Sequence, residues 1–215
     1  MKLCISTDAR TVLADNGSLW TTISGFGVED YQRYLSVFEE ILLIVRSRKT
    51  PRPPNNGFLV SKRGITPYPV PYYEGPWQFL RKRQQIGQKL RFYLKNSAAI
   101  ILRAPHLISF EMVKYIENGR PYGVEVVGDP YDVFRPGSVR TILQPYLRFY
   151  IPRLLKKMCQ NACAVSYVTE GKLQKRYPPN ASAFTAHYSS IDLAESTIVA
   201  KPRDKFSPPY TLFHA

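Results

Sequence analysis

The sequence predicts an α/β fold of the Rossmann-like type, in which helices cover both faces of a mainly parallel sheet. Short, continuous apolar runs recur along the chain, and segments with helical spacing of apolar residues separate most of them. Strands that are buried on both faces have such apolar runs, and parallel strands need connections of helical length. Polar residues or glycines directly follow several runs, which is typical of ligand sites at the carboxyl ends of parallel strands.

The apolar runs give the positions of the strands. The first strand is expected over residues 2–7, ends at Asp8 and leads into a polar loop. The second, over residues 41–45, is apolar throughout and is followed by Arg46. Residues 49–76 are rich in proline and glycine and are expected to be the least regular stretch. The remaining strands are expected at residues 58–60, 98–102, 123–127, 162–168, 182–185 and 210–215.

Helical spacing of apolar residues places helices between these strands. They are expected at residues 28–38, 77–95, 107–118 and 138–161, with a short last helix that Thr169 caps and that ends at Tyr177. In the helix over 77–95, the inward residues are expected to be Leu80, Leu90, Tyr93 and Leu94. In the helix over 138–161, the apolar face is expected to hold Val139, Ile142, Leu143, Tyr146, Leu147, Tyr150, Leu154 and Met158.

Composition limits the class of protein. Hydrophobic residues make up 44% and charged residues 21% of the 215 residues, which is ordinary for a globular protein and excludes disorder over most of the chain. Thirty Lys and Arg residues against sixteen Asp and Glu residues give a net charge of +14. This charge favours an anionic partner, which is nucleic acid, an anionic lipid surface or a phosphorylated substrate.

The cysteines and the N-terminus indicate the cellular compartment. Cys4, Cys159 and Cys163 form an odd set without repeating spacing, which fits reduced thiols better than a disulfide framework. No cluster of metal ligands accompanies them in the sequence, so we expect no metal site. The apolar stretch after Lys2 is too short for a signal peptide, and no run approaches the roughly 18 apolar residues of a membrane-spanning helix. We therefore expect a cytoplasmic protein.

The C-terminal part of the sequence predicts a domain boundary. Residues 195–209 have the proline-rich, charged composition of a linker, and residues 210–215 have the composition of a new strand. We therefore expect an N-terminal Rossmann-like domain over residues 1–198. Residues 199–215 are expected to be a linker and the first strand of a truncated second domain.

The order of these parts resembles the N-terminal domain of the family 4 glycosyltransferases, which are retaining enzymes of the GT-B class. The resemblance spans the whole chain, and order and spacing carry it rather than any single motif. It rests on Gly25-Phe26-Gly27, on residues 102–106, 127–130 and 166–170, and on the linker into residues 210–214. It implies one half of a GT-B fold, with the nucleotide-sugar donor held mainly by a C-terminal domain and with no metal or other cofactor. A fragment without that domain is expected to be inactive.

The resemblance also implies the groups that contact the donor. The glycine loop at residues 25–27 faces the donor diphosphate, because backbone N–H groups without side chains can approach phosphate oxygens. Gly128 stands where many family members carry a histidine that contacts the sugar, so the neighbouring Asp129 is the candidate catalytic residue. The structural alternatives are a tight turn without a ligand and an aspartate that forms a turn before Pro130.

The candidate acceptor-binding residues follow two predicted strands. Arg103 is placed to meet an acceptor phosphate and His106 to line the acceptor cleft, with Thr169 and Glu170 at the end of a later strand. Each has a structural alternative, because Arg103 is also an ordinary loop cation, His106 a lone histidine and Thr169 an N-cap.

Cations on two predicted helices bear on the partners. The resemblance implies a glycan or lipid-linked acceptor, and docking of the basic helices on an anionic membrane surface would place the protein peripherally on the inner membrane face. The alternative for the helices is a solvated face. Nucleic acid is disfavoured because the aromatic residues are scattered, although a basic interaction or nucleic-acid-binding module without catalysis stays the alternative function. The cations concerned are Arg81, Lys82, Arg83, Arg148, Arg153, Lys156 and Lys157.

Overall fold

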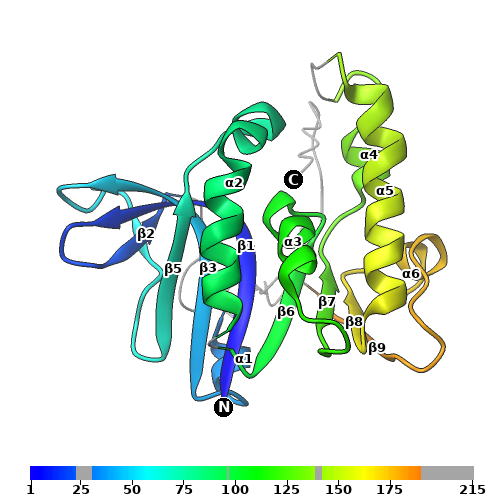
Figure 1. Ribbon diagram of the computed structural model, residues 1–215, viewed down its shortest axis with the longest axis horizontal. Coiled ribbons are helices and arrows are strands. Elements are labelled where there is room, and N and C mark those ends of the chain that lie inside the picture. Colours follow the sequence, from blue (N-terminus) through cyan, green and yellow to red (C-terminus); the bar gives the residue numbers. More distant parts are fainter. Residues whose placement is uncertain (23–30, 96, 139–141, 190–215) are drawn as a thin grey trace, which may run out of the picture.

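Nine strands form one sheet in the computed structural model, which describes residues 1–22, 31–95, 97–138 and 142–189 (Figure 1). Seven of them are parallel and lie in the order β5-β3-β1-β6-β7-β8-β9. This is the Rossmann-type order, in which the chain returns to the middle of the sheet and continues on the other side. The predicted fold class is confirmed. The parallel strands are β1 (Lys2–Ala14), β3 (Glu40–Thr50), β5 (Ile65–Pro71), β6 (Ala99–Ala104), β7 (Gly123–Val126), β8 (Ala164–Tyr167) and β9 (Phe184–His187).

The first strand is much longer than predicted. β1 does not end at Asp8 but continues to Ala14, with an irregularity in its pairing to β3 between Ser6 and Arg10. Its second half also pairs antiparallel with β2 (Leu19–Thr21), which in turn pairs with the short strand β4 (Phe58–Leu59). The prediction that Asp8 and Arg46 follow strand ends is therefore wrong, because β1 continues through its hairpin with β2 and β3 continues beside it to Thr50, so both residues lie inside strands.

The proline-rich stretch contains a strand that the sequence analysis missed. β5 is the edge strand beside β3, although it contains Pro67, Pro69 and Pro71. The three prolines alternate with other residues, so their backbone groups all point to the same side of the strand. That side is the open edge, since the carbonyl of Pro69 accepts hydrogen bonds from Lys89 and Tyr93 instead of from a strand. An edge strand tolerates prolines in this arrangement because no ladder bond is lost.

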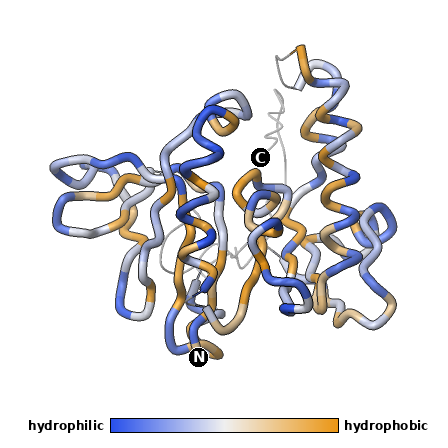
Figure 2. The backbone as a smooth tube through the Cα atoms, in the orientation of Figure 1, coloured by the Kyte–Doolittle hydropathy of each residue, from blue (hydrophilic) through white to orange (hydrophobic). Residues whose placement is uncertain are grey.

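Helices cover both faces of the sheet. One face packs against α2 (Gly75–Leu94), α3 (Leu107–Met112), the 3-10 turn η2 (Val113–Tyr115), α5 (Gln144–Asn161) and α6 (Lys172–Arg176) (Figure 1). The other face packs against the segment around α1 (Gln32–Leu35) through Tyr31 and Tyr34. The short helix α4 (Pro130–Val133) follows β7. In Figure 2, hydrophobic residues line the central strands. Along α2, hydrophilic and hydrophobic residues alternate.

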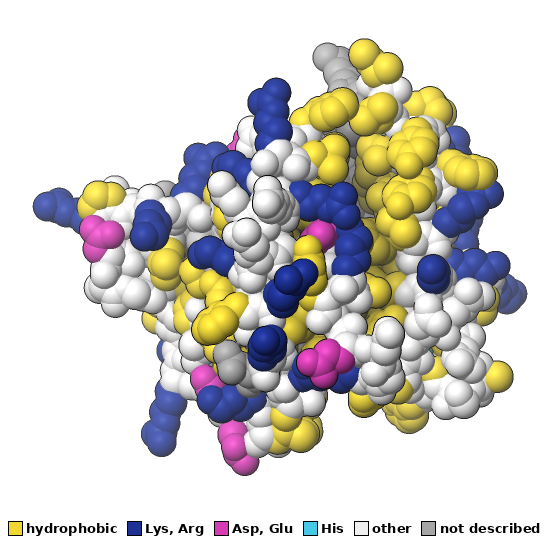
Figure 3. All heavy atoms as spheres, viewed as in Figure 1, with side chains coloured by type: hydrophobic (Ala, Val, Ile, Leu, Met, Phe, Trp, Pro, Cys, Tyr) yellow, Lys and Arg dark blue, Asp and Glu magenta, His cyan; other side chains and the backbone are white. Residues whose placement is uncertain are grey.

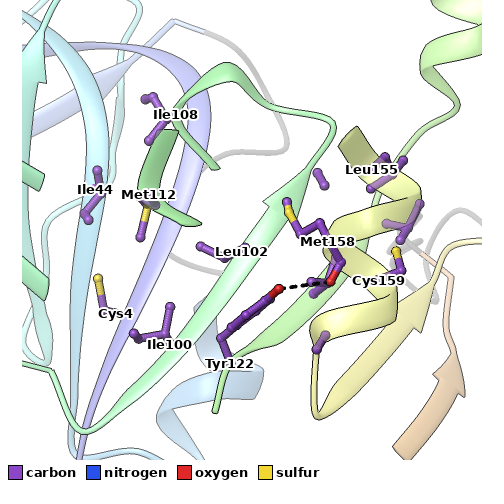
Figure 4. Packing of buried hydrophobic residues seen from close by; sticks show 14 of the residues in the cluster. Cys4, Ile44, Ile100, Leu102, Ile108, Met112, Tyr122, Leu155, Met158 and Cys159 are labelled. Atoms are coloured by element: carbon purple, nitrogen blue, oxygen red, sulfur yellow. Dashed lines mark hydrogen bonds between the residues drawn. The ribbon is translucent and has the colours of Figure 1, made fainter. Parts of the chain in front are cut away.

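The larger part of the core lies between the sheet and α2, α3 and α5. Ile100 and Leu102 of β6 are buried there beside Met112 and Met158 from the helices (Figure 4). The hydroxyl of Tyr122 donates to the carbonyl oxygen of Met158 at 3.1 Å, which satisfies a buried polar group at the end of α5.

Two predicted helices are present, although α5 begins at Gln144 rather than at residue 138, and the residues that they bury match the predicted ones only in part: Leu90 and Leu94 in α2, and Leu147 and Met158 in α5, are buried as predicted. In α2, Leu80 is 50% exposed, and the buried residues are Phe79, Ile86, Gly87, Leu90 and Leu94. In α5, Ile142 before the helix is 99% exposed, and Tyr146 and Tyr150 are exposed as well. Apolar residues occur almost all around this helix, so spacing alone could not select the side that packs. The buried side of α5 holds Leu147, Ile151, Leu155, Met158 and Cys159.

Other predicted helices differ in length. The helix predicted over 107–118 ends earlier, as α3 followed by η2, and of the helix predicted over 28–38 the described part contains only the four residues of α1. The glycine loop at residues 25–27, the domain boundary at 198 and the strand predicted at 210–215 lie outside the described residues. Among the described helices, none is long and apolar enough to cross a bilayer.

Candidate functional site

A buried ion pair lies where β1 and β3 run side by side near the carboxyl edge of the sheet. Arg46 Nε is 3.3 Å from Asp8 Oδ1, and the hydroxyl of Tyr73 donates to the same oxygen at 2.6 Å. The Arg46 guanidinium also donates to the carbonyl oxygens of Asp8 and Tyr73. Burial raises the pKa of Asp8, although Arg46 and Tyr73 act in the opposite direction. These groups satisfy one another and hold the irregular part of β1 in place.

His106 lies at the N-terminus of α3, directly after β6 and next to the point where the strand order reverses. Burial, followed by the positive charges of Arg103 and Arg46, lowers the pKa of His106 to about 3. The imidazole is therefore neutral at pH 7, and one of its two ring nitrogens is an acceptor. Nδ1 is buried and has no hydrogen-bond partner within the part of the chain that the structure describes.

Glu125 in β7 is the centre of a second charged cluster. Its carboxylate accepts a hydrogen bond from Tyr34 at 2.6 Å and lies 3.4 Å from Arg103 Nε and 3.7 Å from Arg33. Arg33 also lies over the rings of Tyr34 and Tyr188, with its central carbon 4.7 Å and 4.6 Å from the ring centres. Burial and the Glu125 charge raise the pKa of Tyr34. The cluster therefore joins β6, β7, α1 and the end of β9.

Several polar atoms of this region are buried without a hydrogen bond among the described residues. They are Arg103 Nε, Glu125 Oε2, Tyr188 Oη and the His106 Nδ1 already noted. Buried polar groups in native proteins are nearly always paired, so unpaired ones are candidates for contact with water or a ligand. Arg103 Nε and Glu125 Oε2 lie 3.4 Å apart and form an ion pair with each other, so His106 Nδ1 is the atom of this set that most clearly lacks a polar partner among the described residues.

Asp129 is held by three partners just beyond the end of β7. Its carboxylate caps α4 by accepting from the backbone N–H of Tyr131 at 3.0 Å, and it accepts from the Tyr177 hydroxyl at 2.6 Å. It also forms an ion pair with Arg176 of α6. Burial, and then the bond to Asp129, raises the pKa of Tyr177. The aspartate thus forms the turn before Pro130 and fastens it to α6.

The neighbouring Gly128 leaves room for a side chain. A Cβ atom built on Gly128 would lie 3.8 Å from Pro105 Cδ, which is an ordinary contact distance. The backbone of Gly128 does not have a positive φ. Neither space nor backbone conformation therefore requires glycine at the position that the family resemblance assigns to a histidine.

Thr169 and Glu170 lie after β8, at the start of α6. The Thr169 hydroxyl accepts a hydrogen bond from the backbone N–H of Leu173 at 3.1 Å and so satisfies the first turn of α6, although Gly171 and not Thr169 occupies the N-cap position. Glu170 is exposed. A role of either residue in acceptor binding stays a prediction.

The structure brings together only part of the predicted site. Arg103 and His106 lie close enough for the charge of one to lower the pKa of the other, while Asp129 belongs to the separate contact with α6. The sequence analysis missed Glu125 and its partner Arg33. The signal for Glu125 was a carboxylate inside an otherwise apolar strand, because such a group needs a partner when buried.

The described part of the candidate site contains no cluster of metal ligands and no activated thiol. No group of three or more His, Cys, Asp or Glu residues that could hold a metal ion occurs within the described ranges. The three cysteines are free thiols, and burial raises the pKa of Cys4 and of Cys159 to about 12. Thiols with such pKa values are largely protonated at pH 7 and are poor nucleophiles.

This chain is similar to parts of longer known proteins. No protein-family model matches the sequence. The chain is 27% identical over 165 residues to Protein CapJ of Staphylococcus aureus, with 74% of this chain and 40% of CapJ covered. A similar solved structure is a UGT transferase from Siraitia grosvenorii in complex with UDP, with a TM-score of 0.45 and 14% identity. That match covers 87% of this chain and 50% of the transferase, so the chain spans half or less of both proteins.

Proposed function

We propose that this chain is the acceptor-side domain of a glycosyltransferase that uses a nucleotide-sugar donor. The observation that supports it most is the buried His106 Nδ1, which has no hydrogen-bond partner among the described residues and lies beside the charged Arg103 and Glu125, near the carboxyl ends of β6 and β7. In a sheet of this order, ligands bind at that edge next to the point of strand reversal. The family resemblance of the sequence supplies the reaction class, which is transfer with retention of the anomeric configuration.

His106 and Arg103 have the chemistry to bind a hydroxylated acceptor. A neutral imidazole accepts a hydrogen bond from an acceptor hydroxyl through Nδ1, and the low pKa keeps it neutral throughout the physiological range. Arg103 forms an ion pair with Glu125 through Nε, and its guanidinium can bind a hydroxyl or a phosphate oxygen through its other N–H groups. The acceptor in this proposal is a glycan or a lipid-linked sugar on the cytoplasmic side of a membrane. Thr169 and Glu170 extend the acceptor site toward α6.

Asp129 has a narrower role in this proposal. A carboxylate has about four lone-pair sites for hydrogen bonds, and three partners already use Asp129. One remaining site can contact the sugar near the reacting bond without breaking the link to α6. Catalysis by such a contact consists of positioning and charge stabilisation, while the leaving diphosphate takes the proton of the acceptor hydroxyl.

In this proposal, the binding site of the nucleotide-sugar donor lies mainly in a different part of the protein. The nucleotide-sugar would be held mainly by a second domain, and its diphosphate would face the glycine loop at residues 25–27. No metal or other cofactor enters this proposal. Residues 1–215 alone should transfer no sugar, and measurable transfer by this chain would contradict the division of labour.

The acceptor site can be tested on this chain by NMR titration with glycans and with short-chain lipid-linked sugars. Binding should shift the amide resonances of residues at the ends of β6 and β7. His106→Gln should weaken it about tenfold, because a hydrogen bond in a desolvated site is lost or distorted. The exposed His187 on β9 provides the matched control, and His187→Gln should leave binding unchanged. Equal effects of the two substitutions, or no binding of any acceptor, would remove this assignment.

The net charge of +14 favours a second candidate function, which is a basic interaction module for nucleic acid. Such binding should fall steeply between about 50 and 200 mM salt, because counterions are released from the phosphates. Fluorescence polarisation with labelled single-stranded and double-stranded oligonucleotides measures it. Salt-sensitive binding without any acceptor binding would favour the module.

A further inference from the structure

The outward side of α5 combines aromatic rings with cations. Tyr146, Phe149 and Tyr150 are 57%, 59% and 41% exposed. Arg153 and Lys157 continue the stripe at helical spacing, since residues three or four positions apart share one side of a helix. No Asp or Glu occurs in the α5 sequence. The helix thus has a buried apolar side and a second, exposed side that is aromatic at its N-terminal end and cationic toward its C-terminal end.

A groove between α4 and α5 extends this surface. It has a volume of about 420 Å³ and is lined by aromatic residues, prolines and arginines, among them Tyr131, Phe134, Phe149 and Arg148. The Arg148 guanidinium lies over the ring of Tyr131 at 4.1 Å. Its Nε atom is buried and has no hydrogen-bond partner among the described residues, so this cation keeps a free donor next to the groove.

We propose that this α4–α5 surface docks on a bilayer that contains anionic lipids. Tyrosine and phenylalanine rings are favoured at the boundary between headgroups and acyl chains, and arginine and lysine contact lipid phosphates. Each cation near an anionic membrane surface adds to the binding. α5 has no carboxylate, and Asp132 of α4 is paired with Lys172 and Arg176, so this aromatic and cationic surface is complementary to such a membrane in both apolarity and charge. The assignment rests on this composition and does not depend on glycosyl transfer.

The other long helix shows why the assignment falls on α5. α2 also has exposed cations, and Trp77 and Phe92 are exposed on it. These two rings are fifteen positions apart, which is roughly 22 Å along a helix, whereas the three rings of α5 occur within about one turn. Figure 3 shows the same contrast, because hydrophobic side chains gather over the region of α4 and α5 at the upper right. On α2, Leu80 is exposed near Trp77, but the cluster of three exposed rings together with the aromatic groove occurs on α4 and α5.

Vesicle sedimentation tests the proposal directly. The chain should bind phosphatidylcholine vesicles that contain 30% phosphatidylglycerol, and should bind pure phosphatidylcholine vesicles much less. The triple substitution Tyr146→Ser, Phe149→Ser and Tyr150→Ser should lower the partition coefficient about tenfold or more, because the apolar area is removed. Arg153→Gln with Lys157→Gln should lower it roughly fivefold for each charge.

A matched control lies on α2. Trp77→Ser with Phe92→Ser removes two exposed rings of similar size and should leave vesicle binding unchanged. All the rings concerned are exposed, so circular dichroism and melting temperature should stay close to the parent values. Equal losses from the α2 and α5 variants would mean diffuse adsorption and would overturn the assignment.

The depth of the contact can be measured with one added tryptophan. Phe149→Trp should give a fluorescence signal that brominated anionic vesicles quench, over and above the signal of the parent protein with its two native tryptophans. Absence of additional quenching would contradict insertion of this side of α5. If sedimentation equilibrium instead shows a dimer that the triple substitution dissociates, with no vesicle binding, the surface joins two copies of the chain and the proposal fails.

Discussion

Glu125 and Asp129 lie on either side of the end of β7, yet their carboxylates are held in different ways. Glu125 has two arginines and a tyrosine around it, and one of its oxygens still has no hydrogen bond among the described residues. Asp129 has a backbone N–H, a tyrosine hydroxyl and an arginine in direct contact. Both carboxylates are thus held by neighbouring side chains, Glu125 mainly through the charges of two arginines and Asp129 mainly through direct hydrogen bonds. The comparison gives Glu125 the larger structural role, because two arginines depend on its charge.

The largest expected effect on stability comes from Glu125. Glu125→Gln removes the charge that Arg103 and Arg33 share, and should lower the free energy of unfolding by about 3 kcal/mol, because a buried cation is left unpaired. Urea titration followed by circular dichroism measures it. Glu74→Gln, which breaks an exposed pair with Arg48, is the control and should change little. A loss below about 1 kcal/mol would mean that the cluster is solvated.

Asp129 should matter less for stability than Glu125. Asp129→Asn weakens the cap of α4, the bond from Tyr177 and the ion pair with Arg176, with an expected cost of about 2 kcal/mol. The same urea titration measures it, with Asp132→Asn on the exposed side of α4 as control and a smaller expected loss. If Asp129→Asn leaves stability unchanged, the carboxylate is not a structural clamp and the contrast with Glu125 disappears.

His106 makes the region around Glu125 sensitive to acid. Its pKa is about 3 in the folded chain and about 6.5 when unfolded, so the unfolded state binds more protons between these values. Its contribution to stability is complete above pH 6.5 and is lost as the pH falls toward 3. The expected slope is about 1 kcal/mol per pH unit. Stability measured from pH 7 to pH 4 should fall less steeply in His106→Gln than in the parent, and parallel curves would contradict the burial of the ring.

The smallest effect is expected at Gly128. Gly128→His should change the free energy of unfolding by less than about 1 kcal/mol, because a Cβ fits there at 3.8 Å from Pro105. The change is measured as the difference in melting temperature between each variant and the parent, with Gly128→Ala as the control for the Cβ atom alone. A large loss for both variants would mean that the strand end admits only glycine, and that the family histidine could not be placed there.

Much of the sheet was predictable because each buried strand is a continuous apolar run. The ranges predicted for β6, β7 and β8 match the structure within two residues or so, and the parallel order follows from the helices between them. β5 was not predictable in this way, because its alternating prolines are tolerated only at an edge that the sequence does not reveal. The length of β1 depends on pairing with β2, which is a tertiary effect.

The candidate site was predictable only in part. Arg103, the last but one residue of β6, and His106 after the strand could be selected by position. Their partner Glu125 comes from the neighbouring strand, and Tyr34 and Arg33 come from a segment far away in the sequence. Likewise, Tyr146 and Tyr150 of α5 were predicted to share its inward face with Leu147 and Met158 but are exposed, because helical periodicity gives the existence of an apolar stripe but not its limits.

The central claim is that this chain holds the acceptor side of a nucleotide-sugar glycosyltransferase. It is tested most directly by calorimetric titration of UDP-, GDP- and ADP-sugars into the complete gene product, with residues 1–215 as control. The account predicts micromolar binding of one of these donors to the complete product and no comparable binding to the control. A complete product that binds none of them would contradict it.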